Sequence, residues 1–144
     1  RSAAYYTTGG EKRKVAIAGV MVCKPKYLIF DEPIAGLDYS SRESFMKVLL
    51  KLKEQGTSII IISHNLDYLA EYADRIIVMN NGKIVLDDLP NIVFGKQQML
   101  DELNIGTCSS KNIINLLKAN DIQMPDNIIK YNDLLNSLIT CFGE

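Results

Sequence analysis

The sequence predicts an α/β fold, in which helices flank a parallel sheet and a small helical extension follows. Two apolar runs of strand length, residues 27–30 and 57–62, enclose a segment whose apolar residues have helical spacing. A strand, a helix and a second strand in this order are typical of a right-handed crossover between parallel neighbours. After residue 88 only helical patterns continue. We therefore expect a sheet domain at residues 1–88 and a helical domain at residues 89–144.

The first predicted strand ends in two adjacent acids. Its sequence, YLIF, is followed by Asp31, Glu32 and Pro33, and the proline stops the strand. Acids at the carboxyl end of a buried parallel strand lie where open α/β sheets bind their ligands. Because neighbouring strand side chains point to opposite sides, the two acids cannot do the same job. One suits a hydrated Mg²⁺ and the other can deprotonate a water, unless the pair is only a solvated strand end.

Three other features lie close to these acids in the sequence. Gly9 and Gly10 open a segment with helical spacing, and such a helix start presents main-chain N–H groups to an anion. His64, the single histidine, follows the second apolar run, and its role there is either functional or structural. Asp38 ends the tight turn AGLD just beyond the acids. These features predict a site for an anionic ligand and a metal ion.

In this order the motifs resemble the ATP-binding cassette (ABC) ATPases. That family carries a signature LSGGQ, a strand ending in the Walker B acids, a D-loop and a switch histidine, and here the order is TTGGE, YLIFDE, AGLD and ISH. The finer resemblance is to the ATPase subunits of energy-coupling-factor (ECF) transporters, the vitamin and cobalt or nickel importers. It runs through GEKRKVAIAGVMVCKPKYLIFDEPIAGLD and DRIIVMNNGKIVLDD. The fold it implies is part of a P-loop NTPase sheet.

The resemblance implies a role for each matching residue. Asp31 would bind Mg²⁺, Glu32 would polarise the attacking water, and His64 would contact the γ-phosphate. The residues expected to close over ATP bound to a second subunit are Thr8, Gly9, Gly10 and Glu11, with Asp38 at the same interface. The implied activity is ATP hydrolysis coupled to transport.

Two departures from the family pattern change what we expect of this chain. Thr7 and Thr8 replace Leu and Ser, while Glu11 replaces Gln and adds a negative charge near the expected triphosphate. The phosphate-loop pattern GxxxxGK[ST] does not occur in the 144 residues. We therefore expect them to be the C-terminal part of a longer ATPase, inactive without the phosphate loop.

Composition limits the kinds of partner. A net charge of -1 gives no electrostatic reason to expect nucleic acid or an anionic membrane surface. No run approaches the roughly 20 apolar residues that cross a bilayer. The three cysteines have neither zinc-site nor disulfide-framework spacing. The resemblance to the ECF ATPases implies a peripheral protein at the cytoplasmic face of the membrane, paired with itself or with a related ATPase subunit and bound to a membrane-embedded component.

The remaining patterns predict the other elements. Ser40, Ser41 and Glu43 resemble a capping box at the start of a helix that Gly56 ends. Residues 66–73 are predicted as a helix that starts near Asn65 or Asp67, and residues 75–79 and 83–86 as a hairpin. Further helices are predicted at residues 97–103, 110–119 and 132–141.

Two alternatives to a transport ATPase stay open. The chain could be a non-catalytic module that binds a cassette partner. It could also be the head of a DNA-repair or chromosome-maintenance ATPase, since those proteins share Glu at the Glu11 position. The absence of a basic stripe and of a coiled-coil lead-in argues against the second alternative. The helical extension would either mediate dimerisation, as in the ECF ATPases, or only pack on the sheet.

Overall fold

The computed structural model describes residue 19 and residues 25–143, which form two compact units that divide between His64 and Asn65. The expected ATP-closing residues Thr8, Gly9, Gly10 and Glu11 lie outside the described residues. Their role therefore stays a prediction, and so does the domain boundary after residue 88.

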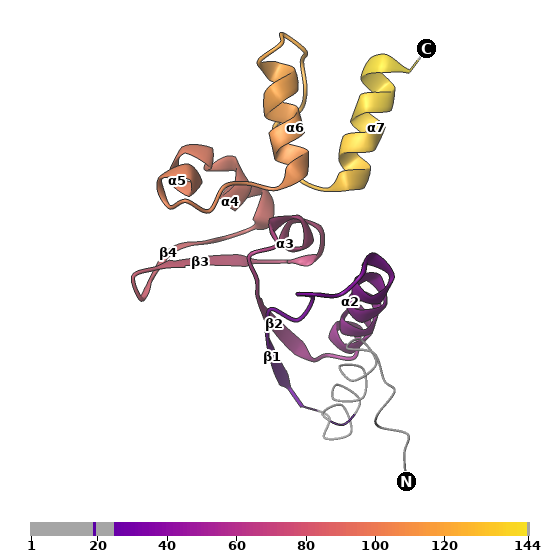
Figure 1. Cartoon of the computed structure of the whole chain (residues 1–144), viewed down its shortest axis with the longest axis vertical. Helices are drawn as coiled ribbons and strands as arrows, with labels where there is room; N and C mark the ends of the chain where they lie inside the picture. Colours follow the sequence, from indigo (N-terminus) through magenta and orange to yellow (C-terminus); the bar gives the residue numbers. More distant parts are fainter. Residues whose placement is uncertain (1–18, 20–24, 144) are drawn as a thin grey trace. The chain divides into compact units, whose positions relative to one another are not determined.

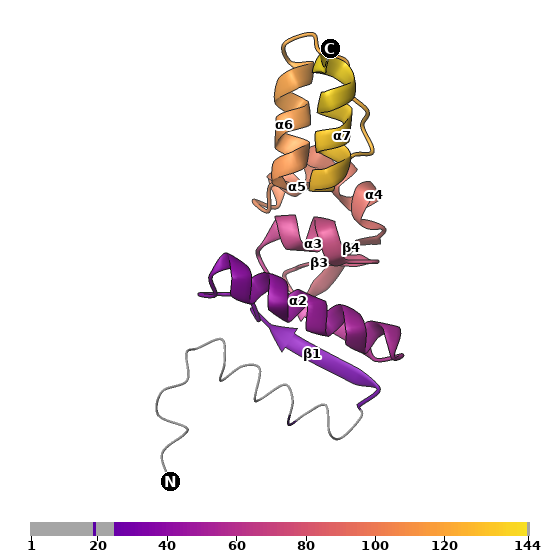
Figure 2. The same ribbon diagram turned by 90° about the vertical axis from the view of Figure 1, so that its right-hand side faces the viewer.

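The first unit contains the predicted crossover. Strand β1 (Tyr27–Asp31) pairs in parallel with β2 (Ser58–Ile62), and α2 (Tyr39–Glu54) connects them. The register places Tyr27 opposite Ser58 and Asp31 opposite Ile62. Figure 2 shows α2 lying along β1. The sequence prediction of two parallel strands joined by a helix is confirmed.

The start of α2 differs from the prediction. The capping box of Ser40, Ser41 and Glu43 is wrong, because the N-cap residue is Asp38. Its Oδ1 accepts a hydrogen bond from the Ser41 main-chain N–H at 2.7 Å, and its Oδ2 accepts from the Ser41 hydroxyl at 3.2 Å. An aspartate at this position satisfies main-chain donors that the helix leaves unpaired, and its charge favours the helix N-terminus.

One face of the sheet in the first unit packs against α2. Phe45 of the helix is buried, and its ring meets the edge of Phe30 with centroids 5.7 Å apart. Leu28, on the same face as Phe30, is also buried. The opposite face is exposed and apolar, with Tyr27, Ile29, Ile60 and Ile62. Parallel sheets are normally covered on both faces, so this exposed face is unusual.

The second unit begins with α3 (Leu66–Tyr72) and a hairpin of β3 (Ile76–Asn80) and β4 (Lys83–Asp88). Asn65 caps α3 by accepting a hydrogen bond from the Tyr68 N–H at 3.2 Å. Asn81 and Gly82 form the two-residue turn with φ of 49° and 74°, as a type I′ turn requires. The predicted helix and hairpin are both confirmed.

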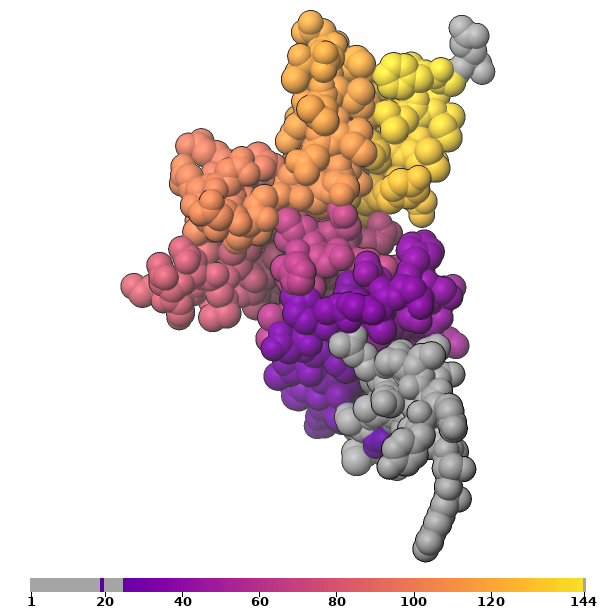
Figure 3. Space-filling model, in the orientation of Figure 1, coloured from indigo at the N-terminus to yellow at the C-terminus, as the bar shows by residue number. Residues whose placement is uncertain are grey.

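Four helices complete the second unit, and the sequence analysis predicts three of them. They are α4 (Pro90–Gly95), α5 (Gln97–Glu102), α6 (Ser109–Lys118) and α7 (Tyr131–Phe142). The unpredicted helix is α4. The sequence feature that could have indicated it is Pro90 at its first position, where the N–H that proline lacks would be unpaired in any case. Figures 1 and 3 show α6 and α7 side by side.

The core of the second unit has two clusters. Phe94 and Leu100 are almost completely buried among residues of the hairpin and α3. Ile114 of α6 is fully buried against Leu134 of α7 and Met124 of the loop between the two helices. The second cluster joins α6 to α7, so these helices form a packed pair. None of the helices within residues 25–143 has the length and apolar character needed to cross a bilayer.

Candidate functional site

The site lies at the carboxyl ends of β1 and β2. Because the strands are parallel and in register, the residues that follow them emerge at the same sheet edge. Asp31 ends β1 opposite Ile62, and the Glu32 main-chain N–H donates to the Ile62 carbonyl at 2.9 Å. Glu32 therefore lies next to Ser63 and His64, although 31 and 32 positions separate them in the sequence.

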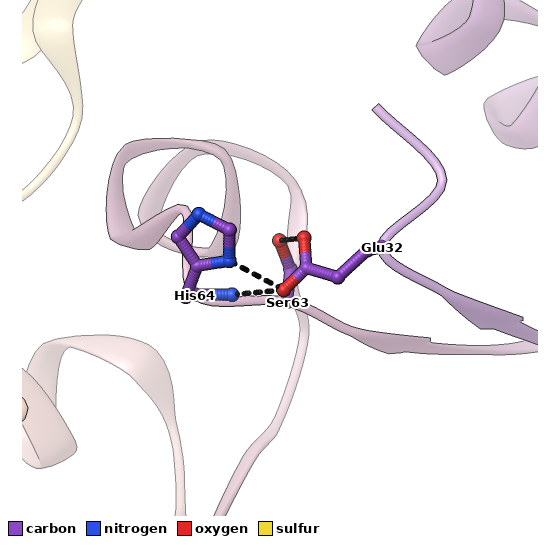
Figure 4. Close-up of polar contacts among 3 residues, drawn as sticks. All are labelled: Glu32, Ser63 and His64. Atoms are coloured by element: carbon purple, nitrogen blue, oxygen red, sulfur yellow. Dashed lines mark hydrogen bonds and ion pairs between the residues drawn. The ribbon is translucent and has the colours of Figure 1, made fainter. Parts of the chain in front are cut away.

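Both carboxylate oxygens of Glu32 accept hydrogen bonds from the segment after β2 (Figure 4). Oε1 accepts from the His64 main-chain N–H at 2.8 Å and lies 2.6 Å from Nδ1 of the His64 ring. Oε2 accepts from the Ser63 hydroxyl at 3.1 Å. The structure thus brings together the two residues expected to be catalytic. It adds Ser63, to which the sequence analysis gives no role although it directly precedes His64.

These contacts fix the charge on Glu32 and the proton position on His64. Partial burial alone would raise the pKa of Glu32, but the hydrogen bonds from the His64 ring, the His64 N–H and the Ser63 hydroxyl outweigh it and lower this pKa below its ordinary value. Glu32 is therefore ionised at neutral pH and can only accept hydrogen bonds. The hydrogen bond between Nδ1 and Oε1 is therefore donated by the His64 ring, and the His64 side chain is 85% exposed.

The main chain at Glu32 is held in a rare conformation. Its φ of 45° lies in the left-handed region, which costs of the order of 1–3 kcal/mol for a residue other than glycine. Such strain is found where the surrounding structure compensates it, often at functional sites. Here the bond to the Ile62 carbonyl and the three side-chain contacts are the compensating interactions. The turn redirects Glu32 from the line of β1 toward β2.

Asp31 supplies one exposed carboxylate beside Glu32 at the strand end. Within the described ranges, no group of three or more His, Cys, Asp or Glu side chains is arranged to hold a metal ion. A single carboxylate nevertheless suits Mg²⁺, which takes one or two carboxylates and completes its shell with waters and nucleotide phosphates. Asp31 therefore fits a magnesium ion that arrives with a nucleotide. Asp38, by contrast, caps α2, and its expected interface role stays a prediction.

Comparison with known proteins shows which family this chain resembles. The family model described as "ABC transporter" matches residues 1–35. The chain is 37% identical over 131 residues to the cobalt import ATP-binding protein CbiO of Syntrophus aciditrophicus, which covers 91% of this chain and 46% of that protein. It is 38% identical over 133 residues to the energy-coupling factor transporter ATP-binding protein EcfA2 of Clostridium perfringens, covering 92% and 47% respectively. The chain is therefore similar, over most of its length, to ABC transporter ATPases.

Solved structures of ABC ATPases share the fold of this chain. CbiO1 from Clostridium perfringens, part of the ABC transporter complex CbiONQ, superimposes with a TM-score of 0.60 and 37% identity over 79% of this chain and 45% of that one. The ATP-binding cassette MJ1267 gives the same TM-score of 0.60 at 29% identity over 69% of this chain and 40% of that one. The chain spans about half the length of the curated relatives it matches. The predicted α/β cassette fold is confirmed.

Proposed function

We propose that the residues at the carboxyl ends of β1 and β2 form part of the ATP-hydrolysis site of an ATPase that drives an ECF-type importer for a vitamin, cobalt or nickel. The observation that carries the proposal is the 2.6 Å contact between Glu32 and His64 at the ends of two adjacent parallel strands. A carboxylate base and an imidazole at this edge are suited to in-line attack of water on a terminal phosphate. The relatives named as cobalt and energy-coupling-factor ATP-binding proteins support the transport role.

Each residue has one task in the proposed reaction. Glu32, ionised and fixed by β2, orients the attacking water and accepts its proton. His64 presents its exposed ring toward the terminal phosphate, and Asp31 would be the residue that holds Mg²⁺. A magnesium ion bound there would supply positive charge that stabilises the charge developing on the phosphate oxygens. The phosphate loop would come from a segment outside the 144 residues, and the strand carrying it would continue the exposed sheet.

Replacing Glu32 with Gln in the complete protein tests the base. Glutamine keeps the size of the side chain but cannot take a proton, so turnover should fall about 10²–10⁴-fold while ATP still binds. An ATP-bound dimer should then accumulate in size-exclusion chromatography. Glu54→Gln, at the exposed end of α2, is the matched control and should leave turnover unchanged. Normal turnover in Glu32→Gln would remove Glu32 from the base role.

Calorimetric titration of the 144-residue chain with Mg-ATP tests the need for the phosphate loop. We expect no binding in the micromolar range, because the main-chain N–H groups and the lysine of such a loop supply most contacts to the β- and γ-phosphates. Micromolar binding followed by turnover would contradict that expectation. If the complete protein binds a cassette partner but does not hydrolyse ATP, the alternative of a non-catalytic interaction module is favoured.

The helical pair α6–α7 is the proposed contact to a second ATPase subunit, of the same or a related kind. Its inner rows are buried, but its outer side exposes apolar residues: Ile113, Leu116, Tyr131, Leu135, Ile139 and Phe142. On α7 the spacing of this row is four, four and three residues, so it follows one side of the helix. The membrane-embedded component would hold the assembled pair at the cytoplasmic face and would set the choice of solute.

Charge on this row tests the contact. The double variant Leu135→Glu and Ile139→Glu should prevent self-association in analytical ultracentrifugation, or association with the related subunit if the pair is a heterodimer. Met79→Glu is the matched control, since Met79 is equally apolar and 63% exposed but lies on the β3–β4 hairpin. Equal effects of both changes would argue against a specific interface on α7.

A further inference from the structure

We propose that Ser63 is a positioning residue for Glu32, and that its hydroxyl and the His64 main-chain N–H hold the carboxylate even when the His64 ring is turned away. The proposal rests on the function proposed above, because Ser63 has this task only if Glu32 orients the attacking water. It concerns a residue whose side chain touches neither the water nor the phosphate in the proposed reaction.

The contacts of Glu32 divide into two kinds. The Ser63 hydroxyl at 3.1 Å and the His64 N–H at 2.8 Å belong to a short side chain and to the main chain, directly after β2. The ring contact at 2.6 Å belongs to a side chain that is 85% exposed and can rotate. Glutamate has three rotatable side-chain bonds, so an oxygen held by only one partner would leave the carboxylate free to turn. The Ser63 hydroxyl donates to Oε2 and so supplies the second fixed point of the carboxylate.

Each carboxylate oxygen of Glu32 can accept only a limited number of hydrogen bonds, so the ring contact must be able to break while the other two contacts stay. An ionised carboxylate oxygen accepts about two hydrogen bonds. Oε1 accepts hydrogen bonds from the His64 N–H and from Nδ1, whereas Oε2 accepts a hydrogen bond from the Ser63 hydroxyl. When the ring turns toward a phosphate, Oε1 gains a free position for the proton of the attacking water. The Ser63 hydroxyl at Oε2 and the His64 N–H at Oε1 then keep the carboxylate in place.

The first test is made by NMR on the 144-residue chain. Because His64 is the single histidine, its ring signals can be assigned directly. In Ser63→Ala the His64 amide should exchange with solvent about tenfold faster, since a hydrogen bond to a charged group is lost from the cluster. Ser63→Thr keeps the hydroxyl and should restore the parent rate. The matched control is Ser58→Ala, an exposed serine at the start of β2, the strand that Ser63 follows, and this variant should change nothing.

Two further results complete this test. His64→Ala should keep a slowly exchanging amide at position 64, because the main-chain contact does not need the ring. The proposal is overturned if Ser63→Ala leaves the amide and ring signals unchanged, or if the amide of the parent chain exchanges as in an unfolded peptide.

The second test measures ATP hydrolysis in the complete protein that carries these residues. Ser63→Ala should lower kcat about tenfold with an unchanged KM for ATP, and Ser63→Thr should restore it. In the Glu32→Gln background Ser63→Ala should have no additional effect, since Ser63 acts only through Glu32. An equal loss in both backgrounds would indicate a general structural role and overturn the proposal. A complete protein without ATPase activity would overturn the proposed function, and the positioning role with it, whatever the NMR test shows of the contact.

Discussion

Truncation of Ile114 to alanine should destabilise the α6–α7 pair more than any change on its outer side. Ile114 is fully buried against Met124, Ile128 and Leu134. The change removes three carbon atoms, which at ~0.8 kcal/mol for each buried CH₂ amounts to about 2.4 kcal/mol before the cost of the cavity. Measured losses for such truncations are about 2–5 kcal/mol, so we expect about 3 kcal/mol. In a unit of this size that lowers Tm by more than about 10 °C.

The assay has to report on the second unit alone. The chain has no tryptophan, and circular dichroism would sum over both units. Urea unfolding is therefore followed through the methyl signal of Met124, which lies in the same cluster. Ile114→Val should cost only about 1 kcal/mol. Leu116→Ala, 66% exposed on the same helix, should stay within about 0.5 kcal/mol in the monomer. A loss below about 1 kcal/mol for Ile114→Ala, or equal losses for Ile114→Ala and Leu116→Ala, would refute this packing argument.

Three other predictions concern the second unit. Lys111 is buried and donates to the Asp126 carbonyl at 2.7 Å, so Lys111→Met should leave that oxygen unpaired and cost about 1–3 kcal/mol in urea unfolding. The Lys118 ammonium, followed by that of Lys111, lowers the pKa of Asp126, so the stabilisation is present above the ordinary pKa and is lost as pH falls through the folded-state pKa. The advantage of the parent over Asp126→Asn should therefore shrink between pH 6 and pH 3, and a constant difference would contradict the ion pair. Gly82→Ala should destabilise the hairpin by about 1–2 kcal/mol in urea unfolding because φ is +74°. Gly95→Ala, in α4 without a positive φ or a close contact, should not destabilise in the same assay.

Much of the fold follows from local patterns in the sequence. Strand runs, helical stripes and the Asn81-Gly82 turn each depend on neighbouring residues, and the structure places β1, β2, α3 and the hairpin close to the predicted positions. The helix α4 was not predicted because it is only six residues long and lacks a side-chain cap. The sequence analysis assigns Asp38 to the expected subunit interface and places the cap of α2 at Ser40 and Ser41. Short-range chemistry decided that position instead.

The sequence by itself determined which side chains are available for the site and that two parallel strands deliver them to one edge. The order of the motifs, the single histidine and the paired acids are all readable without coordinates. Only the tertiary structure decided how these groups meet. Parallel pairing brings Oε1 of Glu32 within 2.6 Å of Nδ1 of His64. The left-handed main chain at Glu32 accompanies the contact of its carboxylate with Ser63. Such contacts depend on register and on strain compensated by neighbours distant in the chain, which no local pattern encodes.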